Sequence, residues 1–220
     1  MSTRRDFTRQ LAAASAALAA PHLARAQANA GAPVEGQHYV KLSTPAPVTL
    51  PSPDKKIDVV EFFWYGCPHC NNFEPMLEGW TRQLPAEVSF RRVHVGFGVQ
   101  HQIHQRLYYA LEEMGVLATM HRKVFAAMHA PNNRRQLISE SEVVAFGNDN
   151  GIDGAKLAAT MKSFSVNTKS VKARQLTDAY KIDGVPALGV QGRWFTSGSL
   201  AGSLERMLVV TNHLIVRARG

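Results

Sequence analysis

The stretch that decides the fold runs from Ile57 to Cys70 and reads IDVVEFFWYGCPHC. Its first part is an almost unbroken run of β-branched and aromatic residues, which is typical of a central strand covered on both faces. Gly66 ends this run, and Cys67 follows at once. Pro68 suits the first position of a helix, where its missing N–H costs nothing. The stretch therefore predicts a buried strand that turns directly into a helix, with the cysteines at the turn.

Cys67 and Cys70 are the two cysteines of the 220-residue chain. A disulfide-stapled scaffold carries more cysteines at wider spacing, and a structural zinc site takes about four ligands. One isolated Cys-x-x-Cys pair is instead typical of a redox-active dithiol. We therefore predict a Cys67–Cys70 disulfide as the reactive group, and we expect no metal and no organic cofactor.

Cys67 is the predicted nucleophile. At the start of a helix, free N–H groups and the positive end of the helix dipole favour an anion. His69 lies between the two cysteines and is expected to stabilise the Cys67 thiolate further. Cys70 lies one turn further along, so we expect it to be less exposed and to resolve mixed disulfides by attacking Cys67. A stabilised thiolate stabilises the reduced form, which makes the disulfide an oxidant.

The rest of the chain predicts a mixed α/β architecture. The pattern between residues 99 and 171 is helical, and a further helix is expected from Leu200 to Val216. A hairpin turn is expected at Gln191-Gly192. Strands are expected at residues 39–42, 56–65, 88–95, 187–190 and 194–196.

The first 26 residues have the three regions of a secretory signal peptide. A short basic stretch precedes the apolar run Leu11–Ala20, and Ala24-Arg25-Ala26 supplies the small residues of a cleavage site. The apolar run is too short to span a bilayer, which takes about 20 residues. Arg4-Arg5 resembles a twin-arginine signal, with a plain Sec signal as the alternative. We therefore expect the mature protein in the periplasm, where disulfides persist.

The formal net charge is +8, and the Lys and Arg residues are scattered along the chain. A nucleic-acid binder would gather them on one face or arm. We therefore predict a mildly basic, solvated surface and no nucleic-acid partner. His101 and His104 would share one face of a helix and could hold a metal, but solvated surface histidines are the simpler interpretation.

The residues from Val60 to Cys70 resemble the active-site region of the DsbA family of periplasmic disulfide oxidases. Gly184-Val185-Pro186-Ala187 resembles the cis-proline loop of that family, and the resemblance covers about residues 36 to 216. It implies an α/β, thioredoxin-like fold with an inserted all-helical domain. The implied division is a thioredoxin-like domain of residues 36–98 and 172–220 with an insertion of residues 99–171.

The resemblance also implies roles for residues near the disulfide. Pro186 is expected to be cis and to face the disulfide, and Val185 is expected to offer backbone hydrogen bonds to an extended substrate. Pro68 and His69 belong to the active-site motif itself.

Glu61 is the odd residue in its apolar strand. Without the family, an edge position that reaches water is one explanation, because acids are seldom buried unpaired. The resemblance instead implies a buried acid beneath the active site that tunes Cys70 and relays its proton. Glu74 and Arg92 are its expected charged neighbours.

The implied activity is that of an enzyme, a thiol:disulfide oxidoreductase that donates its disulfide to reduced, newly exported proteins. The family is re-oxidised by the membrane protein DsbB, so a DsbB-like partner is implied. A disulfide isomerase or reductase on the same fold and a non-catalytic binding module stay open as alternatives. DsbC-type isomerases carry an N-terminal dimerisation domain, whereas a short segment precedes Tyr39. We therefore expect a monomeric oxidase.

Overall fold

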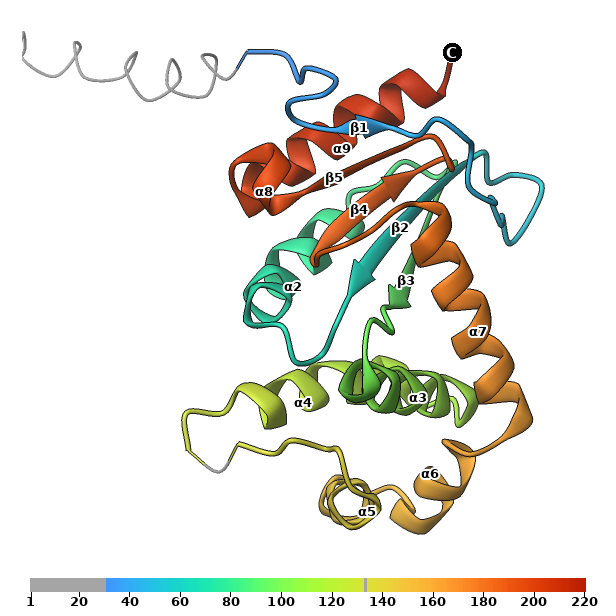
Figure 1. The fold of residues 1–220 in the computed structure, drawn as a ribbon, viewed down its shortest axis with the longest axis vertical. Coiled ribbons are helices and arrows are strands. Elements are labelled where there is room, and N and C mark those ends of the chain that lie inside the picture. Colours follow the sequence, from blue (N-terminus) through green and yellow to red (C-terminus); the bar gives the residue numbers. More distant parts are fainter. Residues whose placement is uncertain (1–30, 133) are drawn as a thin grey trace, which may run out of the picture. The chain divides into compact units, whose positions relative to one another are not determined.

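A mixed five-stranded sheet carries the fold, with the strand order β1-β5-β4-β2-β3 (Figure 1). β2 pairs in parallel with β3 and antiparallel with β4, so it has a neighbour on each side. All seven residues of β2 are buried, which confirms the predicted central strand. The strands are β1 (Val40–Lys41), β2 (Ile57–Phe63), β3 (Val88–His94), β4 (Ala187–Val190) and β5 (Trp194–Ser197).

The structure is a computed structural model that describes residues 31–132 and 134–220. Residues 34–220 form one compact unit. The predicted signal peptide, residues 1–26, lies outside the described residues and stays a prediction. Within the described part, none of the helices combines the length and apolar character that crossing a membrane requires.

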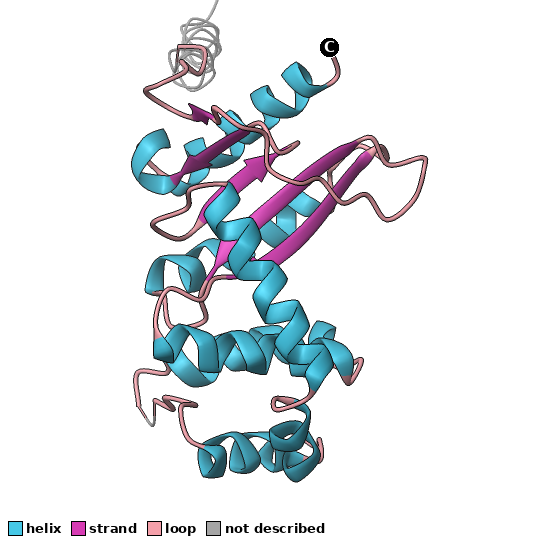
Figure 2. Ribbon diagram, turned by 45° about the vertical axis from the view of Figure 1, so that its right-hand side comes forward, coloured by secondary structure: helices cyan, strands magenta, loops and turns pink. Residues whose placement is uncertain are grey.

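The helices divide between the sheet and the segment that connects β3 to β4. α2 and α9 pack against one another, and α9 also packs on β4 and β5. Five consecutive helices, α3 to α7, follow β3 in the chain, and Figures 1 and 2 show α7 leading back to the sheet. The helices are α2 (Pro68–Thr81), α3 (Val99–Glu113), α4 (Leu117–His129), α5 (Glu140–Asp149), α6 (Gly154–Thr160), α7 (Phe164–Ala179), α8 (Gly198–Ala201) and α9 (Leu204–Ala218).

The helical pattern predicted for residues 99–171 therefore corresponds to α3, α4, α5, α6 and the first half of α7. The boundary expected at residues 171 and 172 falls inside α7, which is continuous from Phe164 to Ala179. One helix thus belongs both to the helical segment and to the return to the sheet.

Side-chain alternation along β2 supplies two cores, one on each face of the sheet. Val59 packs in the core that includes Leu77 of α2 and Leu214 of α9. Val60 packs in the core that includes the helices after β3. Glu61 shares the face of Val59, because successive side chains of a strand point to opposite faces. That face is the one that α2 covers.

The single helix predicted from Leu200 to Val216 is wrong, because the chain breaks there into α8 and α9. Gly202 ends α8 in the left-handed conformation, with a φ of 91°, which glycine adopts without strain. The Ser203 side chain then accepts the backbone N–H of Arg206 and caps α9. The apolar spacing continues across the break, so periodicity alone does not reveal it.

Candidate active site

The turn from β2 into α2 sets the position of Cys67. The Cys67 N–H donates to the Trp64 carbonyl at 3.0 Å, and the Cys67 carbonyl accepts the Asn71 N–H at 3.1 Å. Pro68 occupies the first helical position. Gly66 allows the turn to close, since a Cβ there would lie 2.3 Å from the indole ring of Trp64. Cys67 therefore caps the helix, where the unpaired N–H groups of the first turn favour a thiolate.

The two cysteines, both thiols in this structure, differ in environment. Cys67 is 7% exposed and Cys70 is fully buried. A hydrogen bond from the Cys70 thiol is the main cause that lowers the pKa of Cys67 to about 6, against the opposing effect of burial. Burial and the neighbouring Cys67 raise the pKa of Cys70 well above its ordinary value. At neutral pH this combination gives one thiolate near the surface and one buried thiol.

His69 contributes less to the Cys67 thiolate than Cys70 does. Its backbone N–H and its side chain both lower the pKa of Cys67, but the Cys70 thiol contributes more. The physical reason is that Cys70 follows one turn later in α2, so its buried S–H faces the Cys67 sulfur, whereas the His69 side chain is exposed. Pro68 is exposed as well.

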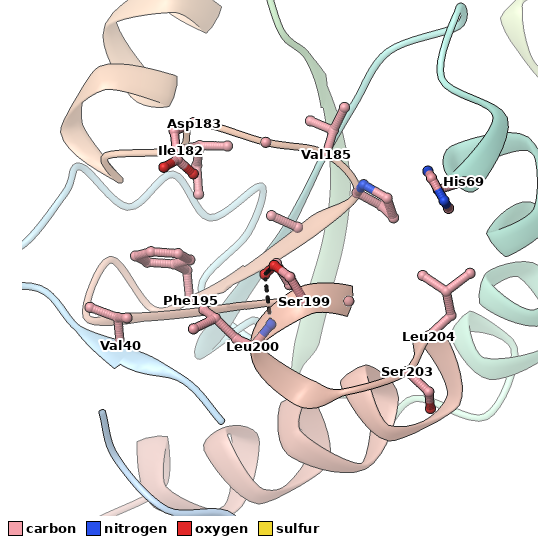
Figure 3. Close-up of a pocket in the computed structure, with 15 residues that line it drawn as sticks. Val40, His69, Ile182, Asp183, Val185, Phe195, Ser199, Leu200, Ser203 and Leu204 are labelled. Atoms are coloured by element: carbon pink, nitrogen blue, oxygen red, sulfur yellow. Dashed lines mark hydrogen bonds between the residues drawn. The ribbon is translucent and has the colours of Figure 1, made fainter. Parts of the chain in front are cut away.

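The loop before β4 lies beside Cys67, although more than a hundred residues separate them in the chain. The Val185–Pro186 peptide bond is cis, as predicted. The Cys67 thiol lies 3.4 Å from the Val185 carbonyl oxygen. Next to this contact is a groove of about 710 Å³, drawn in Figure 3. Its lining includes His69, Val185, Pro186, Phe195, Leu200 and Leu204.

The acid in the central strand is buried and paired, so the water-facing edge position is wrong for Glu61. Its side chain has no exposed surface, and its Oε2 accepts from Arg92 Nε at 3.0 Å. Arg92 of β3 also donates to Glu74 of α2, which confirms the two predicted neighbours. Burial and the charge of Glu74, opposed by Arg92, raise the pKa of Glu61 to about 8. Glu61 is also one of the groups that raise the pKa of Cys70.

The interpretation of His101 and His104 as solvated surface residues is wrong for His104, which is fully buried. His104 Nδ1 accepts from Trp64 Nε1 at 2.9 Å, and His104 Nε2 donates to the Gln136 carbonyl at 2.8 Å. The His101 ring lies 4.1 Å from the Trp64 ring, centroid to centroid. Both ring nitrogens of His104 are therefore occupied, which removes the pair as a metal site.

Two polar residues at the buried charges, His121 and Tyr65, were not predicted from the sequence. His121 of α4 lies with its Nε2 3.2 Å from Glu74 Oε1, and its Nδ1 is 2.9 Å from the Tyr65 hydroxyl. Neither residue carries a local signal, because Tyr65 resembles an ordinary core aromatic and His121 is an isolated histidine in an amphipathic helix. Only the packing of α4 against α2 brings them together.

A thioredoxin-like sheet with a dithiol at the start of a helix and a cis-proline loop beside it defines the class of thiol:disulfide oxidoreductases. The family model described as a DSBA-like thioredoxin domain matches residues 86–206. The chain is 40% identical over 185 residues to the thiol:disulfide interchange protein DsbA of Pseudomonas aeruginosa, covering 84% of this chain and 85% of that protein. It therefore belongs to the DsbA family, and it is a thiol:disulfide oxidoreductase.

Further comparisons agree with this assignment. DsbA of Bordetella parapertussis is 38% identical over 214 residues, which are 97% of each chain. The crystal structure of Pseudomonas aeruginosa DsbA matches with a TM-score of 0.79 at 38% identity, covering 85% of this chain and 95% of that one. The resemblance found in the active-site sequence is thus confirmed.

Proposed function

We propose that this protein is a periplasmic disulfide oxidase, which passes its Cys67–Cys70 disulfide to reduced, newly exported proteins. The observation that carries the proposal is the difference between the two sulfurs. Cys67 has a pKa of about 6, whereas burial keeps Cys70 protonated. A dithiol whose outer sulfur is stable as a thiolate is stabilised in its reduced form, so its disulfide is readily given away.

In the proposed reaction a substrate thiolate attacks Cys67 Sγ, and the Cys67–Cys70 bond breaks. The Cys70 sulfur leaves with the electron pair and takes up a proton, for which protonated Glu61 is the proposed donor. A second substrate thiolate then attacks the substrate sulfur of the mixed disulfide, and Cys67 leaves as the thiolate. The substrate loses two electrons and the enzyme gains them.

The cis-proline loop is the proposed binding element for the substrate. The Val185 carbonyl lies 3.4 Å from the Cys67 sulfur, so an extended peptide paired with Val185 would place its own sulfur beside Cys67. Pro186 would pack against the disulfide, and exposed His69 and Pro68 would border the approaching chain. No metal or organic cofactor takes part in these steps.

Several further proposals complete the cycle. A DsbB-like membrane protein would re-oxidise the reduced enzyme, which would act as a monomer after removal of a signal peptide of residues 1–26.

Residues 36–98 and 172–220 would form the thioredoxin-like domain, and residues 99–171 the inserted helical domain. The helical insertion supports the active site through α3 and α4, whose side chains contact Trp64 and Tyr65.

The decisive experiment is the equilibrium of the Cys67–Cys70 couple with glutathione, combined with oxidation of a reduced peptide that contains two cysteines. An oxidase should have a potential well above the roughly −270 mV of thioredoxin and should oxidise the peptide stoichiometrically. A couple as reducing as thioredoxin would favour the reductase alternative. Efficient rearrangement of a wrongly paired substrate, without net oxidation, would favour the isomerase alternative.

A further inference from the structure

We propose that His121, together with Tyr65, is a positioning residue for disulfide exchange, because it holds Glu74 as a carboxylate and so keeps the shared proton of the buried acids on Glu61. The inference rests on the proposed role of Glu61 as the proton donor to Cys70. It extends that role to two residues outside the dithiol motif and its charged neighbours.

The contacts form a continuous chain from α4 to the base of the active site. Tyr65 and His121 are in contact, His121 lies against Glu74, Arg92 bridges Glu74 to Glu61, and Glu61 influences Cys70. The side chains of Glu61 and Glu74 have no exposed surface, and that of His121 is 8% exposed. A proton bound here is therefore exchanged within the protein rather than directly with water.

The contact with Tyr65 is coupled to which nitrogen of His121 carries the proton. A neutral imidazole has one N–H donor and one acceptor nitrogen. If the Tyr65 hydroxyl donates to Nδ1 at 2.9 Å, the proton of His121 is on Nε2, which lies 3.2 Å from Glu74 Oε1. His121 Nε2 has no other partner among the described residues, and its contact with Glu74 lowers the pKa of that carboxyl.

The Tyr65 backbone is itself fixed. Its N–H donates to His94 Nε2 at 3.3 Å, and its carbonyl accepts from His129 Nε2 at 2.7 Å. The hydroxyl is therefore presented to His121 from a backbone that is held on both sides.

Charge counting then places the proton. Two carboxylates and the permanent cation Arg92 leave a buried net charge of −1 when His121 is neutral, and an uncompensated buried charge is costly. One proton removes that charge. Each acid has one oxygen, Glu61 Oε1 or Glu74 Oε2, that lacks a hydrogen-bond partner among the described residues. The difference lies in the other oxygen: Glu74 Oε1 has both Arg92 and His121 beside it, whereas Glu61 Oε2 has Arg92 alone. Glu61 is therefore the better site for the proton.

The titration behaviour of the groups is consistent with this placement. The pKa of Glu61 is raised to about 8 by burial and by Glu74. The pKa of Glu74 is lowered despite burial, first through His121 and then through Arg92. Burial lowers the pKa of His121, so it is neutral at pH 7.

Three more titratable groups interact with His121 from neighbouring elements. The first is His94 of β3, and burial lowers its pKa well below its ordinary value, so it stays neutral. Tyr108 of α3 lies 6.2 Å from His121, ring to ring, and burial raises its pKa well above its ordinary value, so it stays neutral. Glu78 of α2 lies 3.9 Å from Arg122, and both side chains are well exposed. His94 and Tyr108 therefore hold no charge beside His121, and Glu78 has the exposed cation Arg122 next to it.

Loss of His121 would remove the group that favours ionised Glu74 over ionised Glu61. The proton would then move to Glu74, and Arg92 would pair with an ionised Glu61. Cys70 would have to leave as a thiolate next to a carboxylate and without a proton donor. Disulfide transfer would slow although Cys67 is unchanged.

The test locates the proton by infrared spectroscopy of the oxidised protein at pH 7. A protonated carboxyl group has its own C=O band, which the Glu61→Asp and Glu74→Asp variants assign, because each keeps both acids and shifts the band of the acid that it replaces. We expect the wild-type band to shift in Glu61→Asp and to stay in place in Glu74→Asp. In the His121→Phe background the band should instead shift with Glu74→Asp. Phenylalanine suits the site, since the imidazole already packs edge-on against the Phe63 and Phe125 rings.

Two variants separate electrostatics from packing. His121→Gln keeps an N–H donor and should restore the Glu61 band. Lys123→Gln changes an exposed neighbour on the same helix and serves as the matched control. The rate of disulfide transfer to a reduced peptide should fall about tenfold in His121→Phe. This is smaller than the roughly 10²- to 10⁴-fold that a general acid contributes, because His121 acts through Glu61 and does not donate the proton itself.

A Glu61 band that persists in His121→Phe overturns the inference, and so does an unchanged transfer rate. If His121→Phe does not fold, Tyr65→Phe decides alone, because it removes one hydroxyl and should weaken the Glu61 band in the same direction. A wild-type protein that fails to oxidise the peptide contradicts the proposed function instead. If the wild-type protein oxidises the peptide but the C=O band is the same in His121→Phe and Tyr65→Phe as in the wild type, the result contradicts this inference only.

Discussion

Raising the pH from 5 to 8 should stabilise the reduced protein relative to the oxidised one. The folded reduced state holds Cys67 with a pKa of about 6, whereas an unfolded cysteine titrates near its ordinary pKa of about 8.5. A group whose folded pKa is depressed adds stability above its unfolded pKa and loses it as the pH falls through the folded pKa. The oxidised protein has no thiolate, so the gain belongs to the reduced form alone.

The magnitude follows from the two pKa values. At pH 7 the folded thiolate outnumbers the thiol about tenfold while the unfolded cysteine is mostly protonated, which corresponds to about 1 kcal/mol after allowance for solvent screening. At pH 8 the same reasoning gives about 2 kcal/mol, and at pH 5 almost nothing. Above about pH 8.5 the gain from Cys67 levels off, because unfolded Cys67 ionises as well. Unfolded Cys70 also ionises there while burial keeps folded Cys70 protonated, which lowers the stability of the reduced form.

A disulfide also restricts the unfolded chain. Closing so short a loop stabilises the oxidised form by about 2 kcal/mol in the chain-entropy model. This contribution does not depend on pH. It therefore shifts the stability difference between the two forms by the same amount at every pH. The pH dependence is therefore the part that reports on the Cys67 thiolate.

The assay is urea unfolding of the oxidised and reduced proteins at pH 5, 6, 7 and 8. The free energy of unfolding of the reduced form, minus that of the oxidised form, should rise by about 1 kcal/mol from pH 5 to 7 and by about 2 kcal/mol from pH 5 to 8. The Cys67→Ser variant in reducing buffer is the control and should lack this component. A difference that is flat across this range would refute the reasoning, because it would mean that the fold does not stabilise the thiolate.

Three further predictions concern single substitutions. Cys70→Ala should accumulate mixed disulfides with substrate through Cys67, which non-reducing gels would show, and Cys67→Ala should not. Equal trapping by both variants would contradict the roles of Cys67 as nucleophile and Cys70 as resolving thiol. His69→Ala should raise the pKa of Cys67 by less than Cys70→Ala does, measured by thiolate absorbance against pH; the reverse order would make His69 the main stabilising group. Gly66→Ala should destabilise the protein by about 1–3 kcal/mol in urea unfolding, since the new methyl group meets the Trp64 ring, and an unchanged midpoint would show that the indole moves aside freely.

The sequence predicted the core of the sheet well and the ends of the helices less well. β2 is buried on both faces as its apolar run indicates, and Gln191 and Gly192 form the hairpin turn with positive φ angles of 53° and 62°. The division of the last helix at Gly202 was missed, because a left-handed glycine and a capping serine interrupt the backbone without interrupting the apolar spacing.

The sequence by itself determined the dithiol chemistry. Cys67, Pro68, His69 and Cys70 are contiguous, so the propensity of a strand, a turn and a helix start suffices to place a cysteine at the N-terminus of a helix. The same local reasoning predicts an outer nucleophile and an inner resolving thiol, because position along the first turn decides exposure.

Tertiary structure alone decided the surroundings of those sulfurs. The Val185 carbonyl reaches Cys67 through the pairing of β4 with β2, and His121 reaches Glu74 through the packing of α4 against α2. Such contacts join residues tens of positions apart or more, and no local pattern encodes which side chains meet. Burial likewise turned Glu61 from a conspicuous acid in an apolar run into a carboxyl with a pKa of about 8, since desolvation depends on what the rest of the chain places over it.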